Sequence, residues 1–361
     1  MANNNDKKVL NVPALRFPEF TGVWENITIR EACSEFQSGK NIKAEMINDH
    51  GLYPVYGGNG LRGFTGSYNH DGDYILIGRQ GALCGNVRKV TGKTYVTEHA
   101  IAVCASKEHE TTFLQHLFQK MRLGQYSDQS AQPGLAVNKL LRLNINVPSK
   151  IEQGKIAKIL SLIDERITTQ NKIIEKLQSL IKGIRNNMMS QNHGDCIALQ
   201  DIADIYQPKT IPSTDLTEDG YLVYGANGII GKYHLYNHEK EQICITCRAN
   251  TCGTINYSEP KSWITGNAMV INTDNFAKNV NKRYLFHYLS FINFNRIISG
   301  SGQPQIVRQP LAKLKLILPE LTTQEHIAKC LDTILAKIKN EQTFLQAIQI
   351  QKSYLLSQMF I

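Results

Sequence analysis

The stretch that decides the architecture is Tyr53-Pro-Val-Tyr-Gly-Gly-Asn-Gly60, because it recurs as Tyr221-Leu-Val-Tyr-Gly-Ala-Asn-Gly228 after 168 residues. The offset holds without a gap from 53–103 to 221–271, where 17 of the 51 residue pairs are identical. The shared residues include a Tyr-Asn-His run and a Cys-Gly pair. Self-similarity at one fixed offset is the mark of a duplicated unit. The chain is therefore predicted to contain two copies of one domain.

A second repeated block extends each copy beyond the domain. At an offset of 171 residues, Ser130-Ala-Gln-Pro133 recurs as Ser301-Gly-Gln-Pro304, and the Gln-x-x-Ile-Ala run at 153–157 recurs at 324–328. The second run opens a long apolar repeat in both copies. Each unit is therefore predicted to be a domain followed by a long helix, with segments at 1–148, 149–191, 192–318 and 319–361.

The long helices are predicted from a repeat whose steps alternate between four and three residues. This period of 3.5 residues is typical of a coiled-coil seam. The first seam is Ile156, Leu160, Ile163, Ile167, Gln170, Ile174, Leu177, Ile181, Ile184 and Met188. The second is Ile327, Leu331, Ile334, Ile338, Glu341, Leu345, Ile348, Lys352, Leu355 and Met359. Gln170 and Glu341 place a polar residue in the same layer, which can fix register and partner.

Both helices are expected to begin with capping boxes, Ser149-x-x-Glu152 and Thr322-x-x-Glu325. Since these caps do not align at the offset of 171, one start is expected to be displaced by about a turn. A helix of roughly 40 residues is about 60 Å long. We expect the two helices to pack antiparallel, with a domain at each end. The alternative is two ordinary amphipathic helices, each packed on its own domain.

Within each domain the pattern predicts strands and turns rather than alternating strands and helices. The predicted strands cover 73–78, 95–97, 242–246 and 268–271, and the Gly- and Asn-rich clusters predict turns. A short helix is expected near 112–123 and again near 282–293. The fold class is therefore α+β, with two tandem pseudo-symmetric domains separated by two long helices packed as an antiparallel coiled coil.

Composition narrows the class of partner. The net charge of +9 suits a polyanion, although many mildly basic proteins bind no nucleic acid. No stretch approaches the length of apolar sequence that spans a bilayer, and the polar N-terminus does not resemble a signal peptide. The eight cysteines form no regular framework, which favours reduced thiols in a cytoplasmic protein.

Three segments carry a resemblance to a known family. The opening Pro13-Ala-Leu-Arg-Phe-Pro-Glu-Phe-x-Gly-x-Trp-Glu25 resembles the start of the first target-recognition domain of type I restriction-modification specificity subunits. Pro148-x-x-x-Glu-Gln-x-x-Ile-Ala157 is similar to the start of that family's central spacer helix. Leu318-Pro-x-x-x-Thr-Gln-x-x-Ile-Ala328 is similar to its distal counterpart, with Thr323 where the first copy has Glu152.

The resemblance implies a function for the whole chain. Each recognition domain would read one half of an asymmetric, bipartite site in double-stranded DNA, and the helices would set the gap and dock two methyltransferase (modification) subunits. Restriction subunits would then join the complex. S-adenosylmethionine, ATP and Mg would belong to the partner subunits, so the chain itself is expected to be non-catalytic and to bind no cofactor or metal. Half-sites read from one face of DNA lie roughly 34 Å apart.

Candidate DNA contacts are turns and strand ends that carry basic or amide side chains. Lys and Arg bind phosphates, while Arg suits guanine and Asn or Gln suits adenine at base edges. The candidates are Tyr56, Asn59, Arg62, Arg79, Gln80, Gln132, Tyr224, Asn227, Arg248, Asn250 and Gln303. Differences such as Arg62 against Ile230, or Gln80 against Arg248, are where two readers should diverge. Alternatively, the shared Gly and Asn residues only form turns, and Tyr56 and Tyr224 belong to the core.

Two motif-like spellings are set aside. Gly58-x-Gly60-x-x-Gly63 matches the dinucleotide fingerprint, but no helix is expected after it. His234, His238, Cys244 and Cys247 resemble a zinc set, yet a strand through 243–247 would turn the two cysteines to opposite faces.

No methyltransferase, P-loop or nucleophile-elbow signature is present in the sequence. Two other classes of function stay open beside the DNA-reading subunit. One is an enzyme whose active site lies between the domains. The other is a non-catalytic scaffold that binds protein or carbohydrate and is held by the coiled coil.

Overall fold

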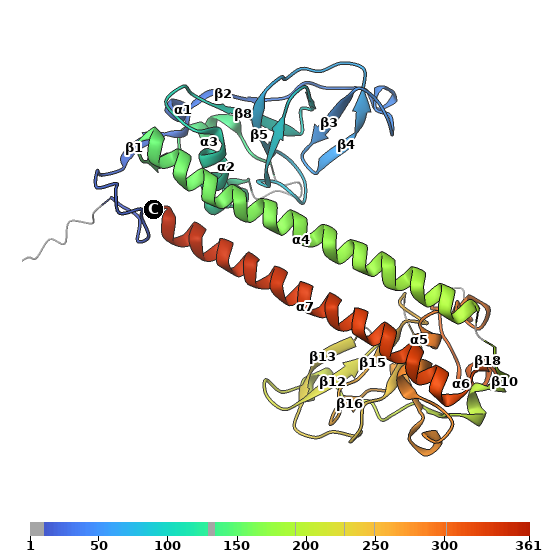
Figure 1. Ribbon diagram of the computed structural model, residues 1–361. Helices are drawn as coiled ribbons and strands as arrows, with labels where there is room; N and C mark the ends of the chain where they lie inside the picture. Colours follow the sequence, from blue (N-terminus) through green and yellow to red (C-terminus); the bar gives the residue numbers. More distant parts are fainter. Residues whose placement is uncertain (1–10, 129–133, 192, 227, 249, 301) are drawn as a thin grey trace, which may run out of the picture. The chain divides into compact units, whose positions relative to one another are not determined.

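The computed structural model describes residues 11–128, 134–191, 193–226, 228–248, 250–300 and 302–361. The chain divides into two compact units (Figure 1). Unit 1 contains residues 1–171 and 344–361, and unit 2 contains residues 172–343. Each unit therefore takes one recognition domain together with a part of each long helix.

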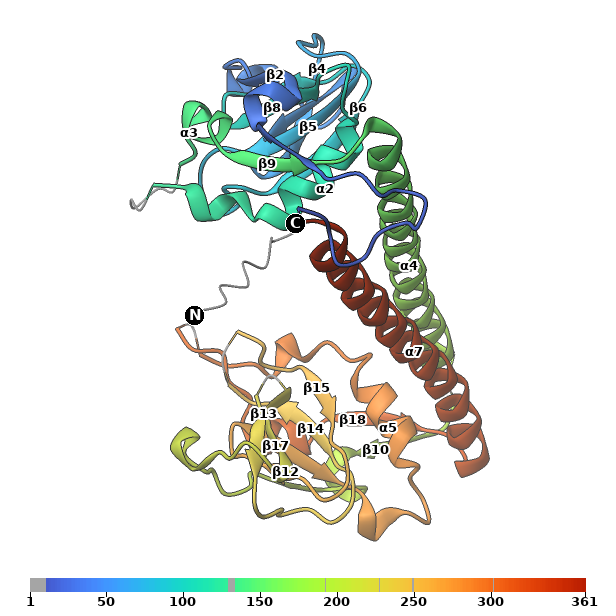
Figure 2. The ribbon, with the colours of Figure 1, turned by 90° about the vertical axis from the view of Figure 1, so that its left-hand side faces the viewer.

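Unit 1 builds three small sheets around one helix. Its elements are β1 (Glu25–Thr28), α1 (Ile29–Ala32), β2 (Cys33–Ser38), β3 (Tyr53–Gly57), β4 (Gly60–Thr65), β5 (Asp73–Gly78), β6 (Val87–Thr91), β7 (Tyr95–Val96), β8 (Ala100–Ala105), α2 (Thr111–Met121), α3 (Val137–Leu141), β9 (Asn144–Val147) and the first part of α4 (Lys150–Ser190). The strand orders are β2-β8-β5-β6, β4-β3-β7 and β1-β9. Helix α2 packs against β5, β6 and β8 (Figure 2).

Unit 2 repeats this arrangement. Its elements are β10 (Asp195–Ala198), β11 (Asp204–Tyr206), β12 (Tyr221–Gly225), β13 (Gly228–Tyr233), β14 (Ile243–Thr246), β15 (Ile255–Tyr257), β16 (Trp263–Ile264), β17 (Ala268–Asn272), α5 (Lys282–Leu289), α6 (Arg308–Ala312), β18 (Lys315–Leu318) and most of α7 (Leu321–Met359). The strand orders β11-β17-β14-β15, β13-β12-β16 and β10-β18 match those of unit 1. The predicted α+β fold with two tandem copies is confirmed.

The glycine-rich repeat forms a β-hairpin in both units. Strand β3 pairs with β4, and β12 pairs with β13, each with one register irregularity at the same aligned place. Gly60 and Gly228 close the two turns with φ of +102° and +99°, a conformation that suits glycine. The spelling Gly58-x-Gly60-x-x-Gly63 therefore lies on a hairpin and not at the start of a helix.

The heptad repeat forms the packed face of both helices. Every seam residue is buried or half-buried. In unit 1 the start of α4, with Ile156 and Leu160, shares a core with Met359 and Phe360 at the end of the chain. In unit 2 the end of α4, with Ile181, shares a core with the start of α7. The helices are thus antiparallel in each unit, as predicted, and their seams continue into the domain cores.

The polar interruption Lys352 is matched within unit 1. Its Nζ lies 2.6 Å from Asp164 Oδ1 on α4 and 3.2 Å from Gln119 Oε1 on α2. The Lys352 side chain is only 16% exposed, and these two partners replace water around its charged ammonium. The break in the second apolar seam is therefore an ion pair that joins both helices to the domain.

The repeated glutamine explains the Gln-x-x-Ile-Ala run. In unit 1, Gln153 Oε1 accepts from Glu110 N at 3.0 Å and Nε2 donates to Pro148 O at 2.9 Å. In unit 2, Gln324 makes the same pair of bonds, with Asn281 N at 2.9 Å and Pro319 O at 2.8 Å. Both side chains are fully buried. Each amide therefore joins the first turn of a long helix to the loop before the domain helix.

The predicted helix caps need correction. Helix α4 begins after Ser149, whose hydroxyl accepts weakly from Glu152 N at 3.5 Å, but the Glu152 carboxylate does not return to the cap. It is buried and accepts from Arg16 Nε at 2.7 Å and from Trp24 Nε1 at 3.4 Å. Arg16 and Trp24 thus attach the N-terminal segment to α4, and Glu152 does not cap the helix.

The second capping box is wrong. Helix α7 begins at Leu321, one residue before Thr322, so that threonine lies inside the first turn. Glu320 O accepts from Thr323 N and Gln324 N at 3.0 Å, which makes Glu320 the equivalent of Ser149. The two helix starts are therefore aligned at the offset of 171 and are not displaced. Thr322 and Glu325 have the spacing of a capping box although both lie inside the helix, and this gave the false signal.

Candidate nucleic-acid interface

Three candidate DNA-contacting residues of unit 1 line one pocket near the end of β5 in the four-stranded sheet. A pocket of about 300 Å³ is lined by Gly57, Gly58, Asn59, Arg62, Gln80 and His99. Asn59 is on the β3–β4 turn, Arg62 is on β4, and Gln80 follows β5. All three side chains are exposed. The structure therefore brings amide and guanidinium groups from separate segments to one opening, which is what base-edge and phosphate recognition require.

His99 is the pocket residue that sequence reasoning missed. It lies on the turn between β7 and β8, with Nδ1 3.0 Å from Gln80 Oε1 and Nε2 3.2 Å from Glu98 Oε1. The signal was present in the repeat: Thr97 and Ala100 match Thr265 and Ala268, whereas the two residues between them differ. Identical flanks around a divergent centre mark a fixed backbone that carries variable side chains.

Arg88 is a second basic group that was not selected. It lies exposed on β6, and a Cβ placed on Gly60 would meet its guanidinium nitrogens at 2.8 Å. The turn conformation, with a φ of +102°, is what favours glycine here, since the end of the flexible Arg88 side chain can move away from a Cβ. Arg62 and Arg88 together give this end of unit 1 a positive character that suits a phosphate backbone.

Arg79 and Tyr56 lie outside the pocket lining. Arg79 is half-buried; its backbone N–H donates to His99 O and its carbonyl accepts from Leu135 N, both at 2.9 Å. Tyr56 packs against the small cluster formed by Leu76, Val90, Val96, Ala100 and Ala102. Gln132 lies outside the described residues. Arg79 therefore holds three segments together through its backbone, and the ring of Tyr56 contributes to packing.

In unit 2 the candidates lie at the equivalent end of the sheet. Arg248 and Asn250 are exposed just after β14, and Gln303 is exposed in the loop before α6. Arg248 forms a β-bridge with Gln305, which ties the strand end to that loop. Tyr224 is buried, and its hydroxyl accepts from Glu259 N at 3.1 Å. Asn227 lies outside the described residues.

The cysteines near this end are packing groups. Cys244 belongs to the same small core cluster as Tyr224, while Cys247 belongs to the large core of unit 2, so the two thiols face opposite sides as predicted. Burial raises the pKa of Cys244 to about 12. Cys84 is half-buried; burial raises its pKa, and its thiol donates to Arg79 O at 3.3 Å. Among the described residues, no group of three His, Cys, Asp or Glu side chains is placed to hold a metal.

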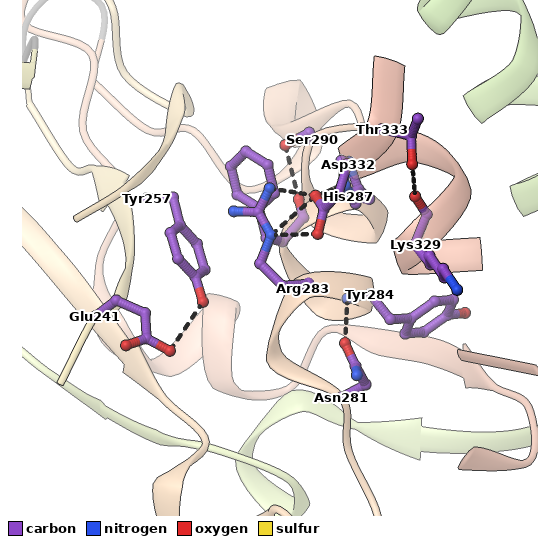
Figure 3. Close-up of polar contacts among 11 residues, drawn as sticks. Glu241, Tyr257, Asn281, Arg283, Tyr284, His287, Ser290, Lys329, Asp332 and Thr333 are labelled. Atoms are coloured by element: carbon purple, nitrogen blue, oxygen red, sulfur yellow. Dashed lines mark hydrogen bonds and ion pairs between the residues drawn. The ribbon is translucent and has the colours of Figure 1, made fainter. Parts of the chain in front are cut away.

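A polar cluster in unit 2 joins its domain to α7 (Figure 3). Arg283 on α5 donates from Nε to both carboxylate oxygens of Asp332 at 2.9 Å, and His287 Nε2 lies 2.8 Å from Asp332 Oδ1. The guanidinium also lies over the rings of Tyr257 and Phe286, 4.3 and 4.7 Å from their centroids. Burial opposes the charged form of Asp332, but bonds from His287 and Arg283 lower its pKa to about 2.

This cluster is structural in character. Each charged member is paired, and Tyr257 donates from its hydroxyl to Glu241 at 3.4 Å, where burial raises the pKa of the phenol. An ion pair of this kind holds one geometry because removing one partner would leave the other unpaired and partly desolvated. The cluster therefore fixes α5 on α7.

The chain is similar in sequence to proteins of one known family. The model of the type I restriction modification DNA specificity domain matches residues 22–179 and 195–349, which together make up most of the chain. The chain is 43% identical over 145 residues to a type I restriction enzyme specificity subunit of Escherichia coli, a match that covers 39% of this chain and 35% of that protein. It is 22% identical over 310 residues to a putative specificity subunit of Haemophilus influenzae, covering 78% and 80%.

Solved structures show the same fold. The S subunit of a type I restriction-modification system from M. genitalium matches with a TM-score of 0.77 and 20% identity, covering 97% of this chain and 99% of that one. A chain from a study of complex assembly and conformational transition of a type I system matches with a TM-score of 0.53 and 14% identity, covering 93% and 97%.

Fold and sequence together define a duplicated, two-domain protein of the class that carries DNA specificity domains. The chain belongs to the family of type I restriction-modification specificity subunits, since the family model matches both of its repeats.

Proposed function

We propose that this chain reads an asymmetric, bipartite sequence in double-stranded DNA, one half with each recognition domain. The observation that carries the proposal is the gathering of Asn59, Arg62 and Gln80 around one pocket, with different side chains at the matching strand end of unit 2. Two domains that share a fold but carry different side chains at the reading end imply two different half-sites. The membership of the family and the net charge of +9 support DNA as the partner.

We further propose that the helices dock two methyltransferase subunits, to which restriction subunits add. Helices α4 and α7 expose apolar side chains away from their seams, among them Ile151, Leu162, Leu180, Ile350 and Tyr354. Exposed apolar groups on otherwise polar helices favour a protein partner. The structurally similar chain that was studied in the assembly of a type I complex is in line with this role. Among the described residues, no helix is long and apolar enough to cross a membrane.

The proposal makes the chain a non-catalytic subunit. S-adenosylmethionine would bind to the methyltransferase subunits, and ATP and Mg to the restriction subunits. In the cytoplasm, where the proposal places it, this chain would supply the address on DNA, and the partner subunits would supply the chemistry.

Modified-base sequencing of host DNA, with and without this gene, tests the proposal. If the chain is a specificity subunit, a split and asymmetric adenine-methylation motif is expected to disappear on deletion and to return on complementation. An unchanged set of modified motifs, while an intact partner methyltransferase is expressed, would overturn the proposal and favour a binding scaffold instead.

The same assay tests a single residue. Arg79→Ala is expected to relax or abolish reading of one half-site and to leave the other half intact, because it removes a guanidinium beside the reading end of unit 1 while the backbone bonds to His99 and Leu135 remain. Counting the methylated sites by half-site sequence gives the answer. Equal loss at both halves would contradict the assignment of one half to each unit.

A further inference from the structure

The two units hold one backbone position in the same way and give it different side chains. In unit 1, Arg79 N donates to His99 O at 2.9 Å, Leu135 N donates to Arg79 O at 2.9 Å, and Gln80 forms a β-bridge with Gly134. These contacts join the end of β5 to the β7–β8 turn and to the loop before α3. They fix the backbone of Gln80 from two sides.

In unit 2 the same contacts recur. Cys247 N donates to Asn267 O at 3.3 Å, Ile306 N donates to Cys247 O at 3.0 Å, and Arg248 forms a β-bridge with Gln305. The offsets of 168 and 171 residues place each of these residues on its counterpart in unit 1. Gln80 and Arg248 are therefore equivalent, whereas the residue before Arg248, which matches Arg79, is a buried cysteine.

The side chains at this position differ in the chemistry that distinguishes purines. Gln80 is an amide that can accept and donate at once, as adenine N6 and N7 require, while Arg248 carries paired donors that match guanine O6 and N7. Both are exposed, and Gln80 lines the pocket of about 300 Å³. The neighbour across the pocket changes together with the reader, from His99 in unit 1 to the exposed Asn267 in unit 2.

We propose that Gln80 reads an adenine in one half-site, that His99 positions its amide, and that Arg248 reads a guanine at the matching place in the other half-site. The inference rests on the proposed function and adds the base that each unit selects. His99 is a positioning residue because it acts through Gln80.

The geometry explains why a positioning residue is needed. A free carboxamide can turn over and exchange its oxygen for its NH2 group, which would present donors where adenine offers its own N6 donor. Nδ1 of His99 lies 3.0 Å from Oε1 of Gln80, so a ring that carries a proton on Nδ1 donates to this oxygen and holds it on the histidine side. In the doubly protonated ring, Nε2 donates as well, to Glu98 Oε1 at 3.2 Å. Oε1 of Gln80 keeps a second lone pair that accepts from adenine N6, and Nε2 of Gln80 stays available to donate to adenine N7.

Base preference within methylated motifs tests the inference in the assembled complex. Gln80→Ala is expected to lower the discrimination for adenine at one position of one half-site by about tenfold or more, the typical weight of a bidentate base contact. Gln80→Arg is expected to shift that position toward guanine, and Arg248→Gln is expected to shift the matching position of the other half toward adenine. Gln37→Ala, which removes an amide bonded to Glu35 outside the pocket lining, is the control.

His99 has its own readout. His99→Phe keeps a ring but no donor, so the Gln80 amide is expected to turn freely and admit guanine beside adenine at that one position. His99→Gln returns a donor and is expected to restore the preference for adenine. A purely structural role would lower the yield of methylated sites without changing the base at one position.

The outcomes separate the proposed function from the assignment of bases. If wild-type cells lack a split motif that depends on this gene, the proposed function fails, and this inference fails with it. If the motif is present and the Gln80 and Arg248 variants leave every base preference unchanged, the inference is overturned while the function stands. The unaltered half-site in each single variant reports that the complex has assembled.

Discussion

At the scale of single residues, the repeated Cys-Gly pair has a geometric cause. Gly85 has a φ of +84°, and a Cβ on it would lie 2.0 Å from the backbone nitrogen of Gly124. Gly253 in unit 2 also has a positive φ, +92°, but its nearest neighbour would be Phe294 Cβ at 3.3 Å. The backbone of both turns thus requires glycine, and unit 1 adds a close approach of two chain segments.

Gly85→Ala is therefore expected to destabilise the protein by roughly 2–4 kcal/mol, since the strain of the conformation adds to a clash with backbone. Gly253→Ala is expected to cost less, because the nearest atom to its Cβ would be Phe294 Cβ at 3.3 Å, against backbone at 2.0 Å for Gly85. The midpoint of urea unfolding measures both changes. Gly66→Ala is the control, because Gly66 has open space around it; an equal loss in that variant would contradict the explanation.

Residues of the candidate site were predictable in part. Asn59, Arg62 and Gln80 were found because turn composition and strand ends can be read along the chain, and the structure brings them to one pocket. His99 was missed because it meets Gln80 only through the pairing of β5 with β8, across 19 residues of sequence. Tyr56 and Tyr224 follow the alternative interpretation as packing groups, since the hairpin turns their rings toward the small cores.

At the scale of elements, the period of the apolar residues predicted the long helices better than the capping motifs predicted their first turns. The seam of α4 and α7 was predicted residue by residue because burial repeats along the helix. The first capping box failed because the Glu152 carboxylate pairs with Arg16 instead. The second failed because α7 begins at Leu321, before Thr322. The bonds of Gln153 and Gln324 to the domains were likewise hidden, although their repetition marked them as shared.

The packing of α2 against both long helices has a consequence for pH. His116 on α2 is buried, with Nδ1 3.9 Å from Asp164 Oδ2 on α4, and Lys352 of α7 bonds to the same carboxylate. Burial lowers the pKa of His116 to about 4; Asp164 opposes this fall, and Lys352 and Lys89 add to it. The folded unit therefore keeps the imidazole neutral at pH values where the unfolded chain binds a proton.

Stability of unit 1 is expected to decrease as the pH falls from the unfolded pKa of about 6.5 toward 4, because only the unfolded state gains the proton in this window. The full loss is roughly 3 kcal/mol at 1.36 kcal/mol per pKa unit. Urea unfolding at about pH 7.5 and about pH 5 is expected to show about 2 kcal/mol of this loss, since pH 5 lies about 1.5 units below the unfolded pKa. His116→Gln should reduce the difference between the two pH values, and the exposed His50→Gln should not; an unchanged difference in the first variant would contradict the assignment.

At the scale of the whole molecule, charge and duplication act on different properties of binding. Under the proposed function, the net charge of +9 contributes a general attraction to DNA that depends on released counterions and therefore on salt. Under the same proposal, the side chains that differ between the units, such as Gln80 and Arg248, set which sequence is preferred. A protein that separates these two functions should allow each to be altered alone.

Salt dependence measures this separation. If each recognition domain neutralises at least about three phosphates, affinity of the assembled complex for its site should fall by roughly 10³-fold between about 50 and 200 mM salt. Gln80→Ala is expected to weaken binding to the specific site but to leave the slope of log affinity against log salt unchanged, because a neutral amide displaces no counterion. Arg62→Ala is expected to reduce the slope if its guanidinium, exposed at the pocket, binds a phosphate. An affinity that did not change with salt would contradict the electrostatic contribution to binding. A changed slope in the Gln80 variant would show that charge and base reading are not separable at this pocket.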